Sequence, residues 1–175
     1  MGNAIQMENH LKYRLLEAMG ISIWIEKRTS ALMSDSPILG AALLVLLPER
    51  LRAVEQEQQK ILTGMLKVLE LGEAELCVAW LSPFKEKDRE EIGKAINQWA
   101  PYRVLVLGEP LAQFLLSTSI GLDEIRLSSQ PIACVIPPLD FTYHPAELEN
   151  SLVCKRKAYQ DLLRLKSQIA EARKV

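Results

Sequence analysis

The residues of this chain that could do chemistry are few, and the most suggestive group follows residue 139. The stretch DFTYHPAEL, residues 140–148, places His144 four residues after Asp140. A histidine beside a carboxylate is a common general acid or base, so a catalytic pair is one interpretation of this spacing. The other interpretation is a proline-bounded turn whose histidine caps or hydrogen-bonds a loop. We favour the turn, because the sequence shows no GxSxG, phosphate-loop or HExxH pattern.

The cysteines do not form a metal-binding pattern. Cys77, Cys134 and Cys154 are widely spaced, contain no CxxC pair, and have only His10 and His144 as further soft ligands. We therefore expect no zinc or iron–sulfur site, and no metal or other cofactor. An odd number of scattered cysteines fits a reducing compartment. Cys77 and Cys134 lie in apolar, strand-like runs and are expected to be buried, inert thiols.

Basic residues cluster in CKRKAYQDLLRLK, residues 154–166, where Lys155, Arg156 and Lys157 are consecutive. These side chains could bind phosphates, but acidic residues surround them in the sequence. A solvated helix face is the favoured interpretation. The formal net charge of the chain is -1, which argues against a protein that coats nucleic acid through its overall charge. We expect at most weak direct DNA binding.

Composition and length indicate one soluble domain. The chain has 175 residues, of which 49% are hydrophobic and 25% charged, enough apolar side chains for a substantial core. Residues 1–18 hold several charges and no apolar core of a secretory signal. The strongest apolar run, PILGAALLVLLP at 37–48, is shorter than the about 20 residues that a membrane-spanning helix needs. We expect a cytoplasmic protein that makes no membrane contact.

Apolar runs alternate with amphipathic ones along the chain. Nearly continuous apolar runs predict buried strands at 39–47, 74–82, 102–108 and 131–137. Helical spacing of apolar residues predicts helices at 52–71, 84–100, 109–119 and 151–173. The apolar residues of the last helix are Tyr159, Leu162, Leu163 and Leu165. Strands separated by helices predict a mostly parallel four-stranded sheet in a three-layer α/β/α domain, with binding sites beyond the carboxyl ends of the strands.

This domain is expected to span residues 37–175, preceded by an N-terminal arm at 1–36. The arm contains a short helix candidate at 11–18, the peptide MGISIWIEKR at 19–28, and a loop-like segment before residue 37. Trp24 lies opposite the isoleucines of its peptide in a strand-like alternation. From these residues alone, Trp24 is equally compatible with a satellite core and with an interface anchor.

Two segments of the C-terminal half resemble the uracil-DNA glycosylase superfamily. RVLVLGEPLAQFLL, residues 103–116, is similar to its third strand and following helix, and TYHPAELENSLVCKRKAYQDLLRL, residues 142–165, is similar to its closing segment. The positions that match the family are His144, Pro145, Lys155 and Arg156. The loop after the first strand reads LLPERLRA at 46–53, where that family has a Gly-Glu-x-Pro-Gly type sequence. The resemblance implies the glycosylase fold. Because the loop after the first strand differs, we expect excision activity to be absent and these four positions to be vestigial.

The stretch LLEAMGISIWIEKRTSAL, residues 15–32, resembles the opening of the psi-subunit family of bacterial DNA polymerase III. In that family a Leu-Gly-Ile run precedes a tryptophan and an arginine, and Ala-Leu follows. The positions that match here are Met19, Gly20, Ile21, Trp24, Arg28, Ala31 and Leu32. Psi proteins have a domain related in shape to the glycosylase fold but without its chemistry, so the two resemblances agree.

The second resemblance implies a non-catalytic adaptor rather than an enzyme. Its arm would bind the clamp-loader ATPase subunits, and its folded domain would hold the chi subunit, which reaches single-strand binding protein. The implied clamp-loader-binding residues are Leu16, Met19, Gly20, Ile21, Trp24 and Arg28. One alternative is a DNA-repair uracil-DNA glycosylase or a nucleic-acid-binding relative of that fold. Another is a member of the same fold with a different role.

Overall fold

The computed structural model describes residues 32–34, 38–49, 51, 55–81, 88–127 and 137–172. Two sets of predictions lie outside these ranges. One is the N-terminal arm up to residue 31, which includes the helix expected at 11–18 and all six residues expected to bind the clamp loader. The other is most of the fourth predicted strand, residues 131–136.

The described strands form a single sheet in the order β1-β3-β2-β4-β5. Four of them are parallel, and their bounds are β2 (Leu43–Leu47), β3 (Leu76–Leu81), β4 (Arg103–Leu107) and β5 (Leu139–Thr142). The chain leaves β2 toward β3 on one side and then continues to β4 and β5 on the other. Such a reversal beside a central strand is where doubly wound α/β folds leave a crevice outside the carboxyl ends of their strands.

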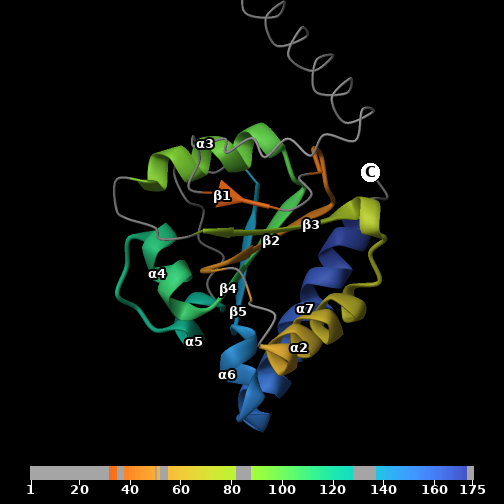
Figure 1. Ribbon diagram of the computed structural model, residues 1–175, viewed down its shortest axis with the longest axis vertical. Helices are drawn as coiled ribbons and strands as arrows, with labels where there is room; N and C mark the ends of the chain where they lie inside the picture. Colours follow the sequence, from red (N-terminus) through yellow and green to blue (C-terminus); the bar gives the residue numbers. More distant parts are fainter. Residues whose placement is uncertain are drawn as a thin grey trace, which may run out of the picture.

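Helices cover both faces of this sheet, as Figure 1 shows. On one face, α7 (Leu152–Ala172) and α6 (Pro145–Glu149) pack against α2 (Gln56–Leu69). On the other lie α3 (Arg89–Trp99) and α4 (Glu109–Leu116). The short helix α5 (Leu122–Ile125) contacts α4 and β5. A short 3-10 turn, η1 (Glu73–Glu75), leads into β3. The prediction of a three-layer α/β/α domain with a mostly parallel sheet is therefore confirmed, but the sheet has five described strands, four of them parallel, where four strands in all were expected.

The core explains why these runs became strands. Every side chain of β2 is buried, and so are the last four of β4. A strand covered by helices on both faces has no solvated side, which is why its sequence shows no polar alternation. The amphipathic helices contribute Met65 and Leu69 from α2 and Ile92 and Ile96 from α3.

The first strand of the sheet was not predicted. Residues Leu32 and Met33 form β1, an edge strand that pairs antiparallel with the outermost parallel strand, β3. The Ser34 hydroxyl donates a hydrogen bond to the Val78 carbonyl oxygen at 2.7 Å. These residues fall within the segment that the sequence indicated as loop-like. Two residues are too few for a pattern, and their pairing depends on the free edge of β3.

The region after residue 120 also differs from the prediction. Residues 139–142 form β5, although proline at 137 and 138 suggested that the last strand had already ended. Helices α5 and α6 were not predicted, because each has only four or five residues and shows no helical period. By contrast, both ends of α7 lie within one residue of the predicted limits, 151 and 173.

Candidate functional site

The carboxyl ends of β2, β4 and β5 meet at one edge of the sheet and bring three short segments together. They are Pro48 and Glu49 after β2, Gly108 and Glu109 after β4, and Tyr143 and His144 after β5. Because the strand order reverses beside β2, this edge is the expected position of a ligand site in such a fold. We call these six residues the switch-point edge.

Gly108 allows the segments after β4 and β5 to approach each other closely. Its φ of +92° is a conformation that favours glycine, and a Cβ there would lie 3.2 Å from the Cβ of His144. Its N–H donates to the Thr142 carbonyl oxygen at 2.9 Å. The glycine therefore sets the distance between α4 and His144.

His144 is the N-cap of α6. Its Nδ1 accepts a hydrogen bond from the Ala146 N–H at 3.2 Å, and its own N–H donates to Glu147 Oε2 at 2.7 Å. Pro145 follows at the first helical position, where the absence of an N–H has no cost, and it is buried. The favoured prediction of a capping histidine in a proline-bounded turn is confirmed, and the turn continues into a helix.

The other ring nitrogen of His144 is in a different situation. Because Nδ1 accepts a hydrogen bond, the neutral ring carries its proton on Nε2. Nε2 is buried and has no hydrogen-bond partner among the described residues. Burial lowers the pKa of His144, and the carboxylates of Glu49 and Glu55 act in the opposite direction. The folded state therefore favours the neutral ring, whose Nε2–H is a hydrogen-bond donor.

The suggested pair of His144 with Asp140 does not form. The Asp140 carboxylate lies 2.9 Å from Arg103 Nε, and its other oxygen accepts from Arg103 Nη2 at 3.2 Å. Both side chains are largely buried, at 12% and 15% exposure. Asp140 therefore serves to join β5 to β4, and the histidine–carboxylate pair suggested by the four-residue spacing is absent.

Lys155 and Arg156, the other two positions that resemble the glycosylase family, lie exposed in the first turns of α7. Lys155 Nζ donates to the Glu149 carbonyl oxygen at 3.4 Å. They are on a different element from His144 and Pro145. Of the three cysteines, Cys77 is a buried thiol in β3 as expected, with its Sγ 3.8 Å from the Ser34 hydroxyl oxygen. Cys154 is a partly buried thiol in α7, and Cys134 is outside the described residues.

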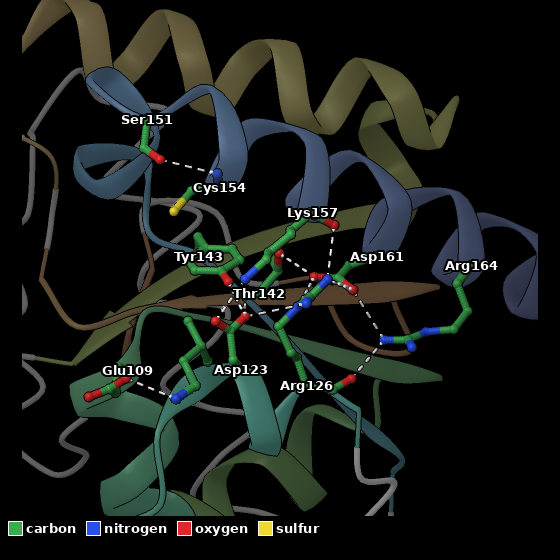
Figure 2. Close-up of polar contacts among 11 residues, drawn as sticks. Glu109, Asp123, Arg126, Thr142, Tyr143, Ser151, Cys154, Lys157, Asp161 and Arg164 are labelled. Carbon is green, nitrogen blue, oxygen red and sulfur yellow. Dashed lines mark hydrogen bonds and ion pairs between the residues drawn. The ribbon is translucent and has the colours of Figure 1, made fainter.

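A polar cluster that the sequence did not reveal joins α5, β5 and α7 (Figure 2). At its centre, Arg126 donates to both carboxylate oxygens of Asp161, each at 2.9 Å. Thr142 donates to the same carboxylate at 3.0 Å. The Arg126 and Asp161 side chains are only 7% and 5% exposed. We call this group, with the residues of the next paragraph, the α5–α7 cluster.

The outer part of the cluster surrounds Asp123. Lys157 Nζ lies 2.8 Å from its carboxylate, and the Tyr143 hydroxyl donates to the same group. Hydrogen bonds from Lys157 and Tyr143 hold the pKa of Asp123 below its ordinary value. Burial raises the pKa of Tyr143. The polar groups of the cluster form hydrogen bonds and ion pairs with one another, so the cluster connects α5, β5 and α7.

Lys157 belongs to the basic stretch for which the sequence favours a solvated helix face, and no motif of the sequence includes Asp123 or Arg126. The only local signal was the three-residue spacing of Asp123 and Arg126 and of Asp161 and Arg164. That spacing is common on exposed helices. The burial of Arg126 and Asp161 arises from a contact between residues 35 positions apart, which no local pattern records.

No three histidine, cysteine or acidic side chains in the described part of the chain gather closely enough to hold a metal ion. No helix there has the length and apolar character needed to cross a membrane.

Comparison with models of known protein families and with curated protein sequences found no match. The function must therefore be inferred from the residues of this chain and their geometry.

Proposed function

We propose that this protein is a non-catalytic adaptor, a psi-type subunit of the bacterial DNA polymerase III holoenzyme. Its N-terminal arm would bind the clamp-loader ATPase subunits in the cytoplasm. Its folded domain, of the uracil-DNA glycosylase type, would hold the chi subunit and so provide an indirect link to single-strand binding protein. Direct DNA binding would be weak at most.

The proposal depends first on the arm sequence. Tryptophan flanked by aliphatic and cationic side chains is typical of interface anchors, and Trp24 lies between Ile23 and Ile25 with Lys27 and Arg28 following. Gly20 would allow a turn between the helix candidate and this peptide. When a peptide becomes ordered on binding, the entropy cost of that ordering lowers its affinity. A lower affinity suits a regulated assembly.

The observation that carries the non-catalytic part is the role of His144. In this domain the residue that resembles a glycosylase histidine caps α6 through Nδ1 and its backbone N–H. Pro145 pre-sets the first helical turn. Both residues thus have a structural role that needs no substrate. This role supports a non-catalytic adaptor built on a fold that enzymes also use.

The test uses Trp24→Ala in the full-length chain. An anchor of this kind contributes about 2 kcal/mol or more to binding, so we expect clamp-loader affinity to fall by roughly 30-fold or more. The melting temperature should stay unchanged. Affinity is measured by surface plasmon resonance on the purified clamp-loader ATPase complex, with Tyr102→Ala, an exposed aromatic of the folded domain, as the matched control.

The opposite result would contradict the proposal. If Trp24 belongs to a satellite core, Trp24→Ala should lower the free energy of unfolding by about 3–5 kcal/mol. Binding, corrected for the unfolded fraction, would then be unchanged.

One observation favours the alternative, a DNA-repair glycosylase. Glu49 follows β2 and His144 follows β5 at the same edge of the sheet, and the Glu49 carboxylate acts to raise the pKa of His144 against the larger effect of burial. A carboxylate and an imidazole at one edge of the sheet are groups that base-excision chemistry could use. We expect no excision from uracil-containing DNA. Excision that is lost in both Glu49→Gln and His144→Asn would establish the alternative.

A further inference from the structure

The outer face of α7 carries more exposed apolar surface than a solvated helix needs. Leu152 is 78% exposed, Val153 63%, Tyr159 52% and Leu163 41%. Single exposed apolar residues are ordinary, but a contiguous group on one element indicates an interaction site. Two of these residues, Tyr159 and Leu163, belong to the apolar set from which the sequence predicted the helix.

The spacing of these residues places them together. Leu152, Arg156, Tyr159 and Leu163 are separated by four, three and four positions, so they form one ridge along the helix. Val153 and Lys155 flank the first turn of that ridge. The ridge extends over about three turns, roughly 17 Å at 1.5 Å per residue. These six residues are called the α7 ridge.

The opposite side of α7 is already in use. Ala158, Leu162, Leu165 and Ile169 are buried in the core, and Asp161 is held by Arg126. Figure 1 shows α2 running beside α7. The helix therefore cannot rotate to bury its ridge within its own domain.

The charges of the ridge have one sign. Residues 151–160 contain three basic residues and no aspartate or glutamate. Lys157 is engaged with Asp123, whereas Lys155 and Arg156 form no ion pair with any other described residue. Glu149 offers Lys155 its backbone carbonyl oxygen. Two cations thus stand among four exposed apolar side chains.

From this complementarity we infer that the α7 ridge docks an acidic amphipathic segment of a partner protein. The leucines, valine and tyrosine would receive its apolar side chains, and Lys155 and Arg156 would pair with its carboxylates. A lipid surface fits less well, since an interfacial helix must sink a whole apolar face into the bilayer. Nucleic acid also fits less well, because phosphates gain nothing from Leu152, Val153 and Leu163. The inference extends the proposed function, which needs a docking surface on the folded domain, but it does not involve the arm.

The test uses the full-length chain and two synthetic helical peptides of about 14 residues, long enough to cover the ridge at 1.5 Å per residue. One peptide combines leucine with glutamate and the other leucine with lysine, in the same amphipathic pattern. Fluorescence anisotropy gives the affinities, and amide chemical shifts identify the contacted residues. We expect the acidic peptide to bind at least roughly tenfold more tightly than the basic one, with shifts confined to residues 151–164.

Variants then test the two components separately. Lys155→Glu with Arg156→Glu should reverse the preference between the two peptides. Tyr159→Ser should weaken acidic-peptide binding by roughly tenfold, because an aromatic anchor is lost. The control is Lys94→Glu on α3, an exposed cation on the other face of the sheet, and it should change nothing.

Several outcomes would overturn the inference. These are equal affinity for both peptides, no binding, shifts located on other elements, or an equal effect of Lys94→Glu. Tighter binding to anionic phospholipid vesicles or to a thymidine 20-mer, lost in the double charge reversal, would assign the ridge to a membrane or to nucleic acid. Self-association that Tyr159→Ser abolishes would assign it to a second copy of the chain. Loss of clamp-loader binding in Trp24→Ala bears only on the arm, so the two proposals fail independently.

Discussion

Arg126 and Asp161 form a buried, two-pronged ion pair that joins the end of α5 to the middle of α7. Two nitrogens of the guanidinium donate to the two carboxylate oxygens at 2.9 Å, across 35 positions of sequence (Figure 2). Lys157 and Arg126 also share a hydrogen bond, from Arg126 Nη2 to the Lys157 carbonyl oxygen at 3.2 Å. The pair therefore fixes the direction in which α7 crosses the sheet, and with it the position of the α7 ridge.

Removing one member of this pair should be costly. Asp161→Asn removes the two-pronged carboxylate from the buried Arg126 and leaves it the more distant Asp123, at 3.4 Å. Breaking a buried pair in this way lowers the free energy of unfolding by about 3–5 kcal/mol. Urea unfolding followed by circular dichroism measures the loss. The exposed pair Lys60–Glu57 on α2 supplies the control, because Lys60→Ala should change stability by less than about 1 kcal/mol. A loss no larger in Asp161→Asn than in Lys60→Ala would show that the buried pair is unimportant.

The outer part of the α5–α7 cluster should make stability sensitive to acid. Lys157 and Tyr143 lower the pKa of Asp123 in the folded state, so the folded protein binds fewer protons there than the unfolded chain. This contribution is complete above the unfolded pKa of about 3.9 and is lost as pH falls through the lower folded value. Asp123→Asn should therefore reduce the pH dependence of unfolding below about pH 4. Glu124→Gln, an exposed neighbour on the same helix, is the control and should leave that dependence intact.

Titration of His144 should also make the folded state less stable as pH falls, but at higher pH than titration of Asp123. Burial lowers its pKa below 6.5, so the unfolded chain binds the proton first, and stability should decrease as pH falls below about 6.5. His144→Asn removes this titration but keeps a good N-cap, whereas His144→Ala also loses the cap, at a cost of about 0.5–2 kcal/mol. Unfolding curves at pH 5.5 and 7.5 separate the two effects. A His144→Asn variant with the same pH dependence as the natural chain would contradict this account.

Substitution by alanine should lower stability at Gly108 and raise it at Gly64. At Gly108 the positive φ and the close Cβ of His144 make Gly108→Ala destabilising, by about 1–3 kcal/mol. Gly64 lies in α2 with nothing within 4 Å of an added Cβ, so Gly64→Ala should stabilise by about 0.5–1 kcal/mol. Thermal melts of both variants test the pair. Equal effects would show that the approach of Gly108 to His144 is not a constraint.

The sequence by itself determined the layers of this protein. Continuous apolar runs indicated β2, β3 and β4, since strands covered on both faces have no polar side to show. Amphipathic spacing indicated α2, α3, α4 and α7 within a few residues. The capping role of His144 was also predictable, because His-Pro followed by Glu147 is a local signal for a helix start. These features depend on neighbours in sequence, which a pattern can record.

Only the tertiary structure decided which partners the charged residues have. Asp140 could be assigned to His144 by spacing, yet it pairs with Arg103, because adjacent parallel strands bring residues 37 positions apart into contact. Nothing in the sequence around Asp161 and Arg126 marks them as buried, yet both are, and α5 and α7 both contact β5. In the same way Tyr159 and Leu163 belong to one apolar pattern with Leu162 and Leu165, and the packing of α7 against the sheet leaves the first two exposed. Such outcomes depend on which elements pack together, and the free energy of that packing is shared among residues far apart in the chain.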